Sequence, residues 1–321
     1  MNFRFGYLFD VAGTKSFRLS SRMQFDEIGG NVQSKNEEFR GIIIPDNGKA
    51  LIQVDQSGAE ALVVAYLAGK GNYRRLFELG IKPHTYLALN IFTNKFRGKH
   101  PIDRYLHRTP DELVALPEWK DLNKSISKDP SNHTEYQLGK KVAHAKAYNM
   151  GPDTFRKQTL KESDGKICLS FAEAKNFLTT YARLFPEIIE WQGKLIDEVK
   201  TTGIIRNLFG HPRSFYQRWN ADVEREILSY IPQSTVGVLT SIVFTELFRY
   251  ATANNLLWDI LVNVHDAVVA QVPIDEAPAA VKKTQELFAI PLTAPSGEIF
   301  HMKSEGMIGA TWNKEDMKEA A

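Results

Sequence analysis

The sequence predicts an α+β protein in which one antiparallel sheet is assembled from the two ends of the chain. A short apolar run, residues 51–54, ends in the carboxylate Asp55 and has the length of a buried strand. Near the other end, two β-rich runs flank His265 and Asp266, which indicates a tight hairpin with Asp266 at its turn. The long segment between them has helical patterns. A sheet built from both ends would bring Asp55 and Asp266 together.

The composition is that of an ordinary globular protein with room for two lobes. The chain has 321 residues, of which 43% are hydrophobic and 24% are charged, and its formal net charge is +2. This mildly basic balance permits nucleic-acid binding without indicating it. The single Cys168 excludes an internal disulfide framework. No signal peptide opens the chain and no apolar run reaches membrane-spanning length, so we expect a cytoplasmic protein.

The first half of the chain alternates between irregular and helical patterns. Residues 1–50 contain glycines and a proline at short intervals, which predicts loops and strands. Residues 59–92 have a helical pattern that is broken near Gly69 and at Pro83. Residues 93–135 are polar and basic and contain four prolines, which predicts an insertion of short helices and loops. The charges of this basic insertion are explained most simply as a solvated surface.

The second half is mainly helical up to the hairpin. Residues 135–155 predict a helix that ends near a Gly-Pro pair. Apolar residues at helical spacing predict a long amphipathic stretch over residues 171–201. Residues 204–215 predict a β-ribbon, and residues 221–251 predict a second long helix. After the hairpin we expect a helix over residues 278–288 and a short tail.

Asp55 and Asp266 are the candidate metal ligands. A strand end and a hairpin turn each hold a carboxylate in a fixed direction, and carboxylate oxygens are the ligands that hard divalent cations prefer. Two carboxylates far apart in sequence are what two-metal phosphoryl transfer requires. Taken singly, Asp55 is also explained as a helix N-terminal carboxylate and Asp266 as an ordinary turn residue.

Seven short motifs follow one another along nearly the whole chain. They are Arg18-Leu-Ser-Ser21, Asn31-Val-Gln33, Asp55-Gln-Ser-Gly-Ala-Glu60, Pro83-His-Thr85, the run from Gly139 to Tyr148, the run from Arg225 to Gln233, and Val264-His-Asp266. In this order they resemble family A DNA polymerases, the relatives of bacterial DNA polymerase I and of many phage replicative enzymes. Each motif alone is weak, but seven in order make the resemblance specific.

The resemblance implies a right-hand polymerase that acts in DNA replication. Its palm, an antiparallel sheet with packed helices, would comprise residues 1–61 and 202–321, and its mostly helical fingers residues 62–201. The implied activity is template-directed nucleotidyl transfer from a dNTP to the 3′-OH of a primer. Asp55 and Asp266 would bind two Mg²⁺ ions, for which Mn²⁺ is a substitute. One ion would lower the pKa of the 3′-OH and the other would neutralise triphosphate charge.

Further matches imply contacts with nucleotide and DNA. Glu60 matches the acidic residue that closes the sugar pocket against a ribose 2′-OH, which argues for dNTPs. His84 matches a histidine near the triphosphate, and His265 matches a residue at the primer terminus. The matches to primer-template contacts, which read the minor groove by shape rather than by sequence, are Arg18, Asn31, Gln33, Arg225 and Gln233.

The predicted nucleotide-binding helix of the fingers has two registers on the family pattern. The preferred register places Lys140, His144 and Tyr148 on the positions of an arginine, a lysine and an aromatic residue, at i, i+4 and i+8 on one face. The other register uses Lys146 as the phosphate-binding lysine and puts Met150 at the aromatic position. Without the other motifs, a solvated basic helix face with Tyr148 in the core explains the same residues.

Several departures from the family pattern shape the expectation. Ala267 stands where the family often has glutamate, and Leu62 stands where it has an arginine of a structural ion pair. The insertion before the fingers helix is long, and neither a thumb nor an exonuclease domain precedes Arg18. We therefore expect part of a split or truncated phage-type enzyme, located in the host cytoplasm if phage-encoded, whose thumb and exonuclease lie on a second polypeptide.

Two other functions remain open at this point. One is a catalytically weak or inactive DNA-binding remnant or accessory protein. The other is a single-subunit RNA polymerase, which shares the palm but against which Glu60 argues.

Overall fold

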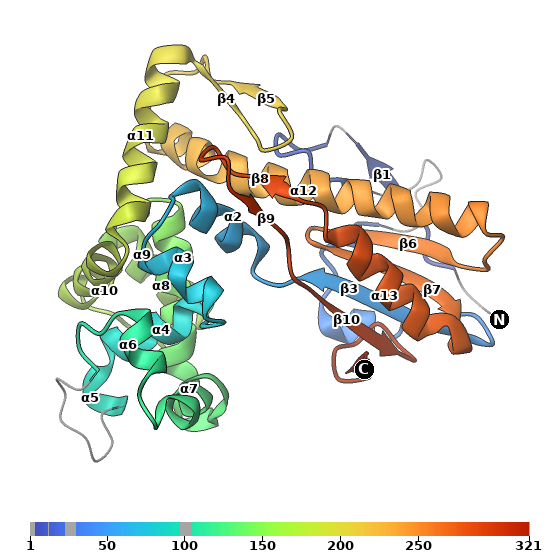
Figure 1. Ribbon diagram of the computed structural model, residues 1–321, viewed down its shortest axis with the longest axis horizontal. Helices are drawn as coiled ribbons and strands as arrows, with labels where there is room; N and C mark the ends of the chain where they lie inside the picture. The colour runs from blue at the N-terminus through green and yellow to red at the C-terminus, as the bar shows by residue number, and fades with distance from the viewer. Residues whose placement is uncertain (1–3, 12, 23–29, 97–104, 321) are drawn as a thin grey trace. The chain divides into compact units, whose positions relative to one another are not determined.

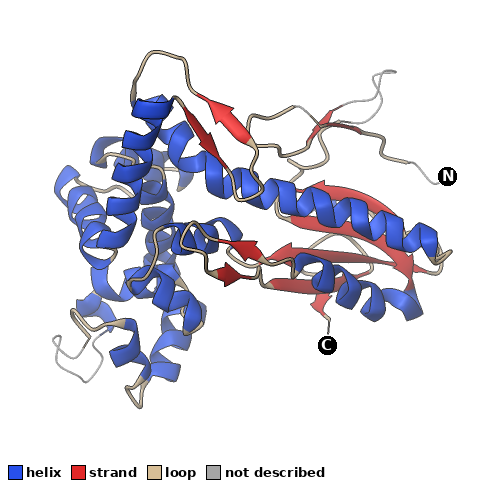
Figure 2. Ribbon diagram, turned by 45° about the horizontal axis from the view of Figure 1, so that its top comes forward, coloured by secondary structure: helices blue, strands red, loops and turns tan. Residues whose placement is uncertain are grey.

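The computed structural model describes residues 4–11, 13–22, 30–96 and 105–320 (Figure 1). The chain divides into two compact units. Unit 1 comprises Met1–Val63, Arg206–Pro212 and Tyr230–Ala321, and unit 2 comprises Val64–Ile205 and Arg213–Ser229. Unit 1 contains a five-stranded sheet, whereas unit 2 is almost entirely helical (Figure 2). The predicted α+β class is therefore confirmed, and the assignment of residues to palm and fingers stays a prediction.

The core of unit 1 is an antiparallel sheet that joins the start of the chain to its end. The strand order is β11 (Met317–Glu319), β10 (Ser304–Gly309), β3 (Lys49–Gln56), β7 (Ala267–Pro273) and β6 (Asp259–Val264). The strand predicted from residues 51–54 is the central β3. The short tail predicted after residue 288 supplies β10 and β11, two strands that the sequence pattern did not predict. Two glycines in β10 weakened its strand signal.

The two faces of β3 have different surroundings. Alternate residues of a strand point to opposite faces, so Ile52 and Val54 share one face and Asp55 lies on the other. Helix α13 (Ala277–Phe288) covers the Val54 face, because a Cβ atom at Gly306, opposite Val54 in register, would lie 2.1 Å from Val281 Cγ1. Both α13 and the long helix α12 (Ala221–Ala253) run alongside the strands (Figure 1). Asp55 is thus on the face that α13 leaves uncovered.

Smaller elements complete unit 1. Strand β1 (Leu8–Asp10) pairs with β2 (Ser20–Arg22), and β8 (Leu292–Thr293) pairs with β9 (Ile299–Phe300). The helices α1 (Glu37–Arg40) and η3 (Ile274–Glu276) are single turns. Strands β4 (Ile204–Arg206) and β5 (Pro212–Ser214) form the ribbon predicted for residues 204–215, which lies at the division of the units.

Unit 2 is built from short and medium helices. They are α2 (Ala59–Leu67, which begins in unit 1), α3 (Asn72–Glu78), α4 (Pro83–Ile91), α5 (Thr93–Phe96), α6 (Pro110–Val114), α7 (Trp119–Lys128), η2 (Pro130–Asn132), α8 (His133–Ala147), α9 (Pro152–Glu162), α10 (Phe171–Leu184) and α11 (Pro186–Thr202). The predicted insertion of short helices over residues 93–135 corresponds to α5, α6, α7 and η2, and residues 97–104 of it lie outside the described residues.

Prolines divide the long stretches that the sequence pattern left continuous. The stretch predicted over residues 171–201 is two helices, because Pro186 has no N–H and forces Phe185 out of the helical region, to φ −130° and ψ 60°. Similarly, α8 ends at Ala147, and Pro152 begins α9 as the first residue of a new helix. The helix thus ends before the Gly151-Pro152 pair, as the sequence predicted.

Helices α4 and α8 approach each other closely at Gly139. A Cβ atom there would lie 2.5 Å from the carbonyl oxygen of His84 and 3.2 Å from the amide nitrogen of Ala88. Because both atoms belong to the backbone of α4, no rotation of a side chain makes room for a larger residue. Glycine at this position therefore fixes the distance between α8 and the helix that carries His84.

Helix α12 corrects one expectation about membranes. At 33 residues it is long and apolar enough to cross a bilayer, alone among the helices of the described segments. However, 72% of its most apolar window is buried within the protein. Such burial is typical of a core helix, which passes the same test of length and composition.

Candidate active site

The structure brings Asp55 and Asp266 together in unit 1. Asp55 is the penultimate residue of β3, and Asp266 lies in the turn between β6 and β7, as the hairpin pattern predicted. In register Asp55 is opposite Ala267, and Gln56 N donates a hydrogen bond to the carbonyl oxygen of Asp266 at 3.1 Å. The two carboxyl groups are close enough for each to influence the ionisation of the other. Their role as catalytic metal ligands stays a prediction.

The electrostatics of this pair favour a bound cation. Burial, followed by the negative charge of Asp266, raises the pKa of Asp55 to about 7. Burial also raises the pKa of Asp266. Two half-buried carboxyl groups this close resist ionising together unless positive charge compensates them. Carboxylate oxygens suit Mg²⁺, so the pair fits the predicted ions. In the described ranges no group of three or more His, Cys, Asp or Glu residues could hold a metal, so this pair is the candidate.

We expect Asp55→Asn to stabilise the protein in EDTA at pH 8. The raised pKa of Asp55 means that the folded state holds this proton more tightly than the unfolded state. That stability is fully present below pH ~4 and is lost as the pH rises through about 7. Asparagine avoids this loss, and because partial exposure screens the repulsion, a gain of about 1–2 kcal/mol is expected. Thermal scans at pH 5 and pH 8 measure it; a gain that is equal at both values contradicts the explanation.

Two buried polar side chains anchor the turn that carries Asp266. Gln56 and Thr240 are 1% and 0% exposed. Gln56 Nε2 donates to Thr240 Oγ1 at 2.8 Å and to the Asp266 carbonyl oxygen at 3.3 Å. Thr240 Oγ1 lies 2.8 Å from the carbonyl oxygen of Val236 and 3.3 Å from that of His265. These bonds tie the turn to α12, a connection that no sequence motif indicated.

His265 and the acidic residue Glu60 also lie in unit 1. His265 lies in the same turn as Asp266, with a left-handed backbone at φ 56°. Glu60 forms an ion pair with Arg18, whose side chain is 21% exposed. Leu62 stands where the family pattern has an arginine, so the ion pair expected from that arginine is missing. Glu60 nevertheless has a cationic partner in Arg18. Arg18 packs closely on α12, since a Cβ atom at Gly237 would lie 2.9 Å from Arg18 Cγ.

The side chain of Gln33 is hydrogen-bonded within unit 1, and its role in DNA binding stays a prediction. Its side chain is buried, and Nε2 donates to the carbonyl oxygens of Leu19 at 2.9 Å and Asn263 at 2.6 Å. Gln33 Oε1 accepts from Ser21 N at 2.9 Å. Asn31 Oδ1 accepts from Ser21 Oγ at 2.7 Å and from Gln33 N at 3.0 Å. These bonds already use the amide of Gln33, so a direct DNA contact through it would require them to break.

The two remaining DNA-contact candidates lie on α12 but in different units. Arg225 is exposed in unit 2 and forms an ion pair with Asp222 one turn earlier. Gln233 is half-buried in unit 1. Both roles stay predictions.

In unit 2, His84 faces the fingers helix candidate, α8. Its Nε2 lies 2.6 Å from the hydroxyl oxygen of Tyr136. Burial, with smaller contributions from the charges of Lys82 and Lys140, lowers the pKa of His84 to about 4. His84 is therefore neutral at pH 7 and close to a lysine. Tyr136 was missed by the motif comparison, although its position four residues before Lys140 places it on the same helix face.

The end of α8 changes the predicted face. Because the helix ends at Ala147, Tyr148 is its C-terminal cap, with φ −111° and ψ 21°, and does not continue the helical face. Its ring still contacts His144, at 4.9 Å between centroids. Within α8, Tyr136, Lys140 and His144 share one face, and Tyr148 follows the helix as its cap.

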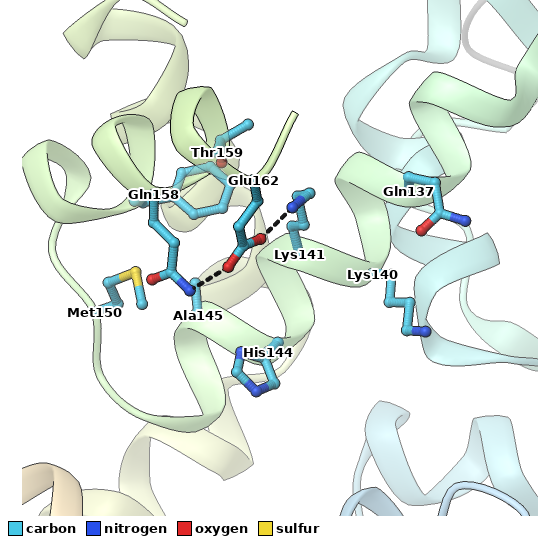
Figure 3. Close-up of a pocket in the computed structure, with 10 residues that line it drawn as sticks. Gln137, Lys140, Lys141, His144, Ala145, Met150, Gln158, Thr159 and Glu162 are labelled. Atoms are coloured by element: carbon cyan, nitrogen blue, oxygen red, sulfur yellow. Dashed lines mark hydrogen bonds and ion pairs between the residues drawn. The ribbon is translucent and has the colours of Figure 1, made fainter. Parts of the chain in front are cut away.

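A pocket of about 300 Å³ lies beside α8 and α9 (Figure 3). It is lined by Gln137, Lys140, Lys141, His144, Ala145, Met150, Phe155, Gln158, Thr159 and Glu162. On one side Glu162 pairs with Lys141, while Lys140 points away from that pair (Figure 3). Lys146, the phosphate-binding lysine of the second register, does not line this pocket. Burial lowers the pKa of the Lys146 amine, and the backbone carbonyl oxygen of Lys146 accepts a hydrogen bond from Gln192 Nε2 at 2.7 Å. The pocket thus contains Lys140 and His144 of one register and Met150 of the other.

Known proteins resemble this chain over most of its length. "DNA polymerase I, thermostable" from Thermus filiformis is 26% identical over 285 residues, which is 86% of this chain and 28% of that protein. "DNA polymerase I" from Streptococcus pneumoniae is 25% identical over 317 residues, which is 93% of this chain and 30% of that protein. This chain therefore spans less than a third of the length of these curated relatives.

A solved structure and a family model extend these matches. The "POL domain of Pol1 from M. smegmatis complex with DNA primer-template and dNTP" superposes with a TM-score of 0.70 at 18% identity, covering 96% of this chain and 48% of that one. The likeness supports the right-hand polymerase fold. The model of DNA polymerase family A matches residues 123–314, more than half of the sequence. This chain belongs to DNA polymerase family A.

Proposed function

We propose that this chain is the palm and fingers portion of a template-directed DNA polymerase, which transfers nucleotides from dNTPs to the 3′-OH of a primer. Unit 1 would be the palm and unit 2 the fingers. The observation that carries the proposal is the close pair of carboxyl groups, Asp55 at the end of β3 and Asp266 in the β6–β7 turn, in a family A chain. The similar M. smegmatis domain, described as a complex with primer-template and dNTP, supports the same substrates.

Asp55 and Asp266 would hold two Mg²⁺ ions, or Mn²⁺ in their place. When bound, such ions acidify the primer 3′-OH and compensate the charge of the triphosphate. The contribution of the chain itself is to fix the two carboxylates. Strand β3 fixes the direction of the Asp55 side chain. The hydrogen bonds of Gln56 and Thr240 to the hairpin turn fix the backbone that carries Asp266. A site fixed in this way loses little energy to reorganisation during the reaction.

In unit 2, phosphate recognition would fall to Lys140 and His84. Lys140 is exposed and supplies a positive charge. His84 is neutral at pH 7 because its pKa is about 4, so it can exchange a hydrogen bond but adds no charge. His144 and Tyr148 form a contacting ring pair next to Lys140, and we propose them as the aromatic surface for the incoming base.

Glu60→Ala should raise the incorporation of rNTPs relative to dNTPs by about tenfold to a hundredfold, because the removed carboxylate is proposed to occupy the place of a ribose 2′-OH. Competing single-nucleotide incorporation of dNTP and rNTP measures the ratio. Arg18→Ala is the matched control, since it removes the same ion pair and keeps the Glu60 carboxylate. An equal change in both variants would assign the selectivity to the ion pair instead.

Primer extension tests the proposed function. The full chain is incubated with Mg²⁺, a primer-template and single dNTPs, and only the dNTP complementary to the template base should be added. Primer-template binding without incorporation in either Mg²⁺ or Mn²⁺ would favour the DNA-binding remnant, and a preference for rNTPs would favour an RNA polymerase. The predicted second polypeptide, the phage-type origin and the cytoplasmic location stay part of this proposal; a partner that carries a thumb should lengthen the products.

A further inference from the structure

Asp55 has an acidic neighbour on its own face of the sheet that the sequence motifs did not indicate. In register, Asp55 lies between Ala267 of β7 and Glu305 of β10. Residues directly opposite one another on antiparallel strands point to the same face, with Cβ atoms about 4.5–5.5 Å apart. Ala267 has no functional group in its side chain. The acidic neighbour of Asp55 across the strands is therefore Glu305 of β10.

The carboxylate of Glu305 is held toward the end of β3. Ser57, two residues after Asp55, donates from Oγ to Glu305 Oε1 at 2.7 Å. The backbone N–H of the same serine donates to the carbonyl oxygen of Lys303 at 2.9 Å, which fixes the start of β10. The negative charge of Glu305 acts on the Asp55 carboxyl, and the positive charge of Lys314 acts on it in the opposite sense.

We propose that Glu305 is a third acidic residue of the metal site, which strengthens cation binding at Asp55 and takes the place of a carboxylate at Ala267. The inference rests on the proposed function and deepens it. Glu305 does not complete a group of three ligands anywhere in the part of the chain that is described. Its negative charge therefore acts on the bound cation through space or through a water molecule that the ion binds. Glu305 is thus a positioning residue and not a direct ligand.

Binding of Mn²⁺ to the full chain, followed by the electron paramagnetic resonance signal of the free ion, tests this proposal. Glu305→Gln should weaken binding about threefold to tenfold at low ionic strength, because the exposed charge of Glu305 acts on the Asp55 site across solvent. The control is Glu319→Gln, an exposed residue on β11 opposite Met307, which should leave the affinity unchanged. Unchanged affinity in Glu305→Gln overturns the proposal.

A second readout separates charge from structure. In 0.5 M KCl the difference between Glu305→Gln and the wild type should shrink, since exposed charges are screened. In EDTA the variant should keep its Tm, because the glutamine oxygen still accepts the Ser57 hydrogen bond. A lowered Tm together with a salt-independent loss of affinity would make Glu305 a structural residue and refute the inference.

Asp55→Ala and Asp266→Ala distinguish this inference from the proposed function. If both lose Mn²⁺ binding while Glu305→Gln retains it, only the role of Glu305 fails. If both retain full Mn²⁺ binding, the metal site itself is misplaced, and the proposed function fails with it.

Discussion

Asp266→Ala and Asp55→Ala should each reduce the rate of primer extension by at least about 1,000-fold, or roughly 4 kcal/mol of transition-state stabilisation. Each variant removes one of the two carboxyl groups that share the proposed ions, and the described residues offer no third ligand group to replace it. The measurement is the single-turnover rate of incorporation of one dNTP at saturating primer-template.

The isosteric variants Asp55→Asn and Asp266→Asn separate chemistry from folding. Since Asp55→Asn is expected to raise the stability of the metal-free protein, its loss of activity cannot be assigned to unfolding. Asp259→Asn is the matched control, because Asp259 is an exposed residue of β6 that pairs with Lys49. Extension by Asp55→Ala or Asp266→Ala within tenfold of the wild-type rate would remove the two-metal assignment.

Gly139→Ala should lower the free energy of unfolding by about 1–3 kcal/mol, the usual cost of overpacking. The added Cβ would lie 2.5 Å from the carbonyl oxygen of His84, so the backbones of α4 and α8 must separate. The same separation moves His84 away from Lys140, and the affinity for dNTP should fall as well. Urea denaturation measures the stability, and the KM for dNTP measures the second effect.

Gly193→Ala in α11 is the matched control. A Cβ atom at Gly193 would meet no heavy atom within 4 Å, so alanine there should stabilise the helix by up to about 1 kcal/mol. If Gly139→Ala and Gly193→Ala shift the urea midpoint in the same direction, the close approach of α4 and α8 does not limit stability.

The sequence was sufficient for the parts of the fold that local patterns encode. The apolar run before Asp55 and the two β-rich runs around Asp266 predicted β3 and the hairpin, because the alternation of a buried strand and the chemistry of a tight turn are both local. Strand β10 was missed because its glycines lower strand propensity, and its position is decided by contact with β3 and α13.

The parts of the candidate site that remained hidden depend on register and burial. Glu305 is opposite Asp55 only because β10 pairs with β3 in one register, which no local pattern reveals. The contact between Gln56 and Thr240 joins residues that are 184 positions apart. Gln33 matched a DNA-contact motif, yet burial commits its amide to the protein interior. A motif match thus does not reveal which hydrogen bonds a side chain makes within the folded protein.

Anomalous diffraction from crystals grown with Mn²⁺, a terminated primer on its template, and the next dNTP tests the assignment of the metal site most directly. The expected result is two manganese peaks, each about 2 Å from a carboxylate oxygen of Asp55 or Asp266, the distance typical of small divalent ions. Manganese bound elsewhere in the complex, with both of these carboxylates free of metal, would contradict the proposed site.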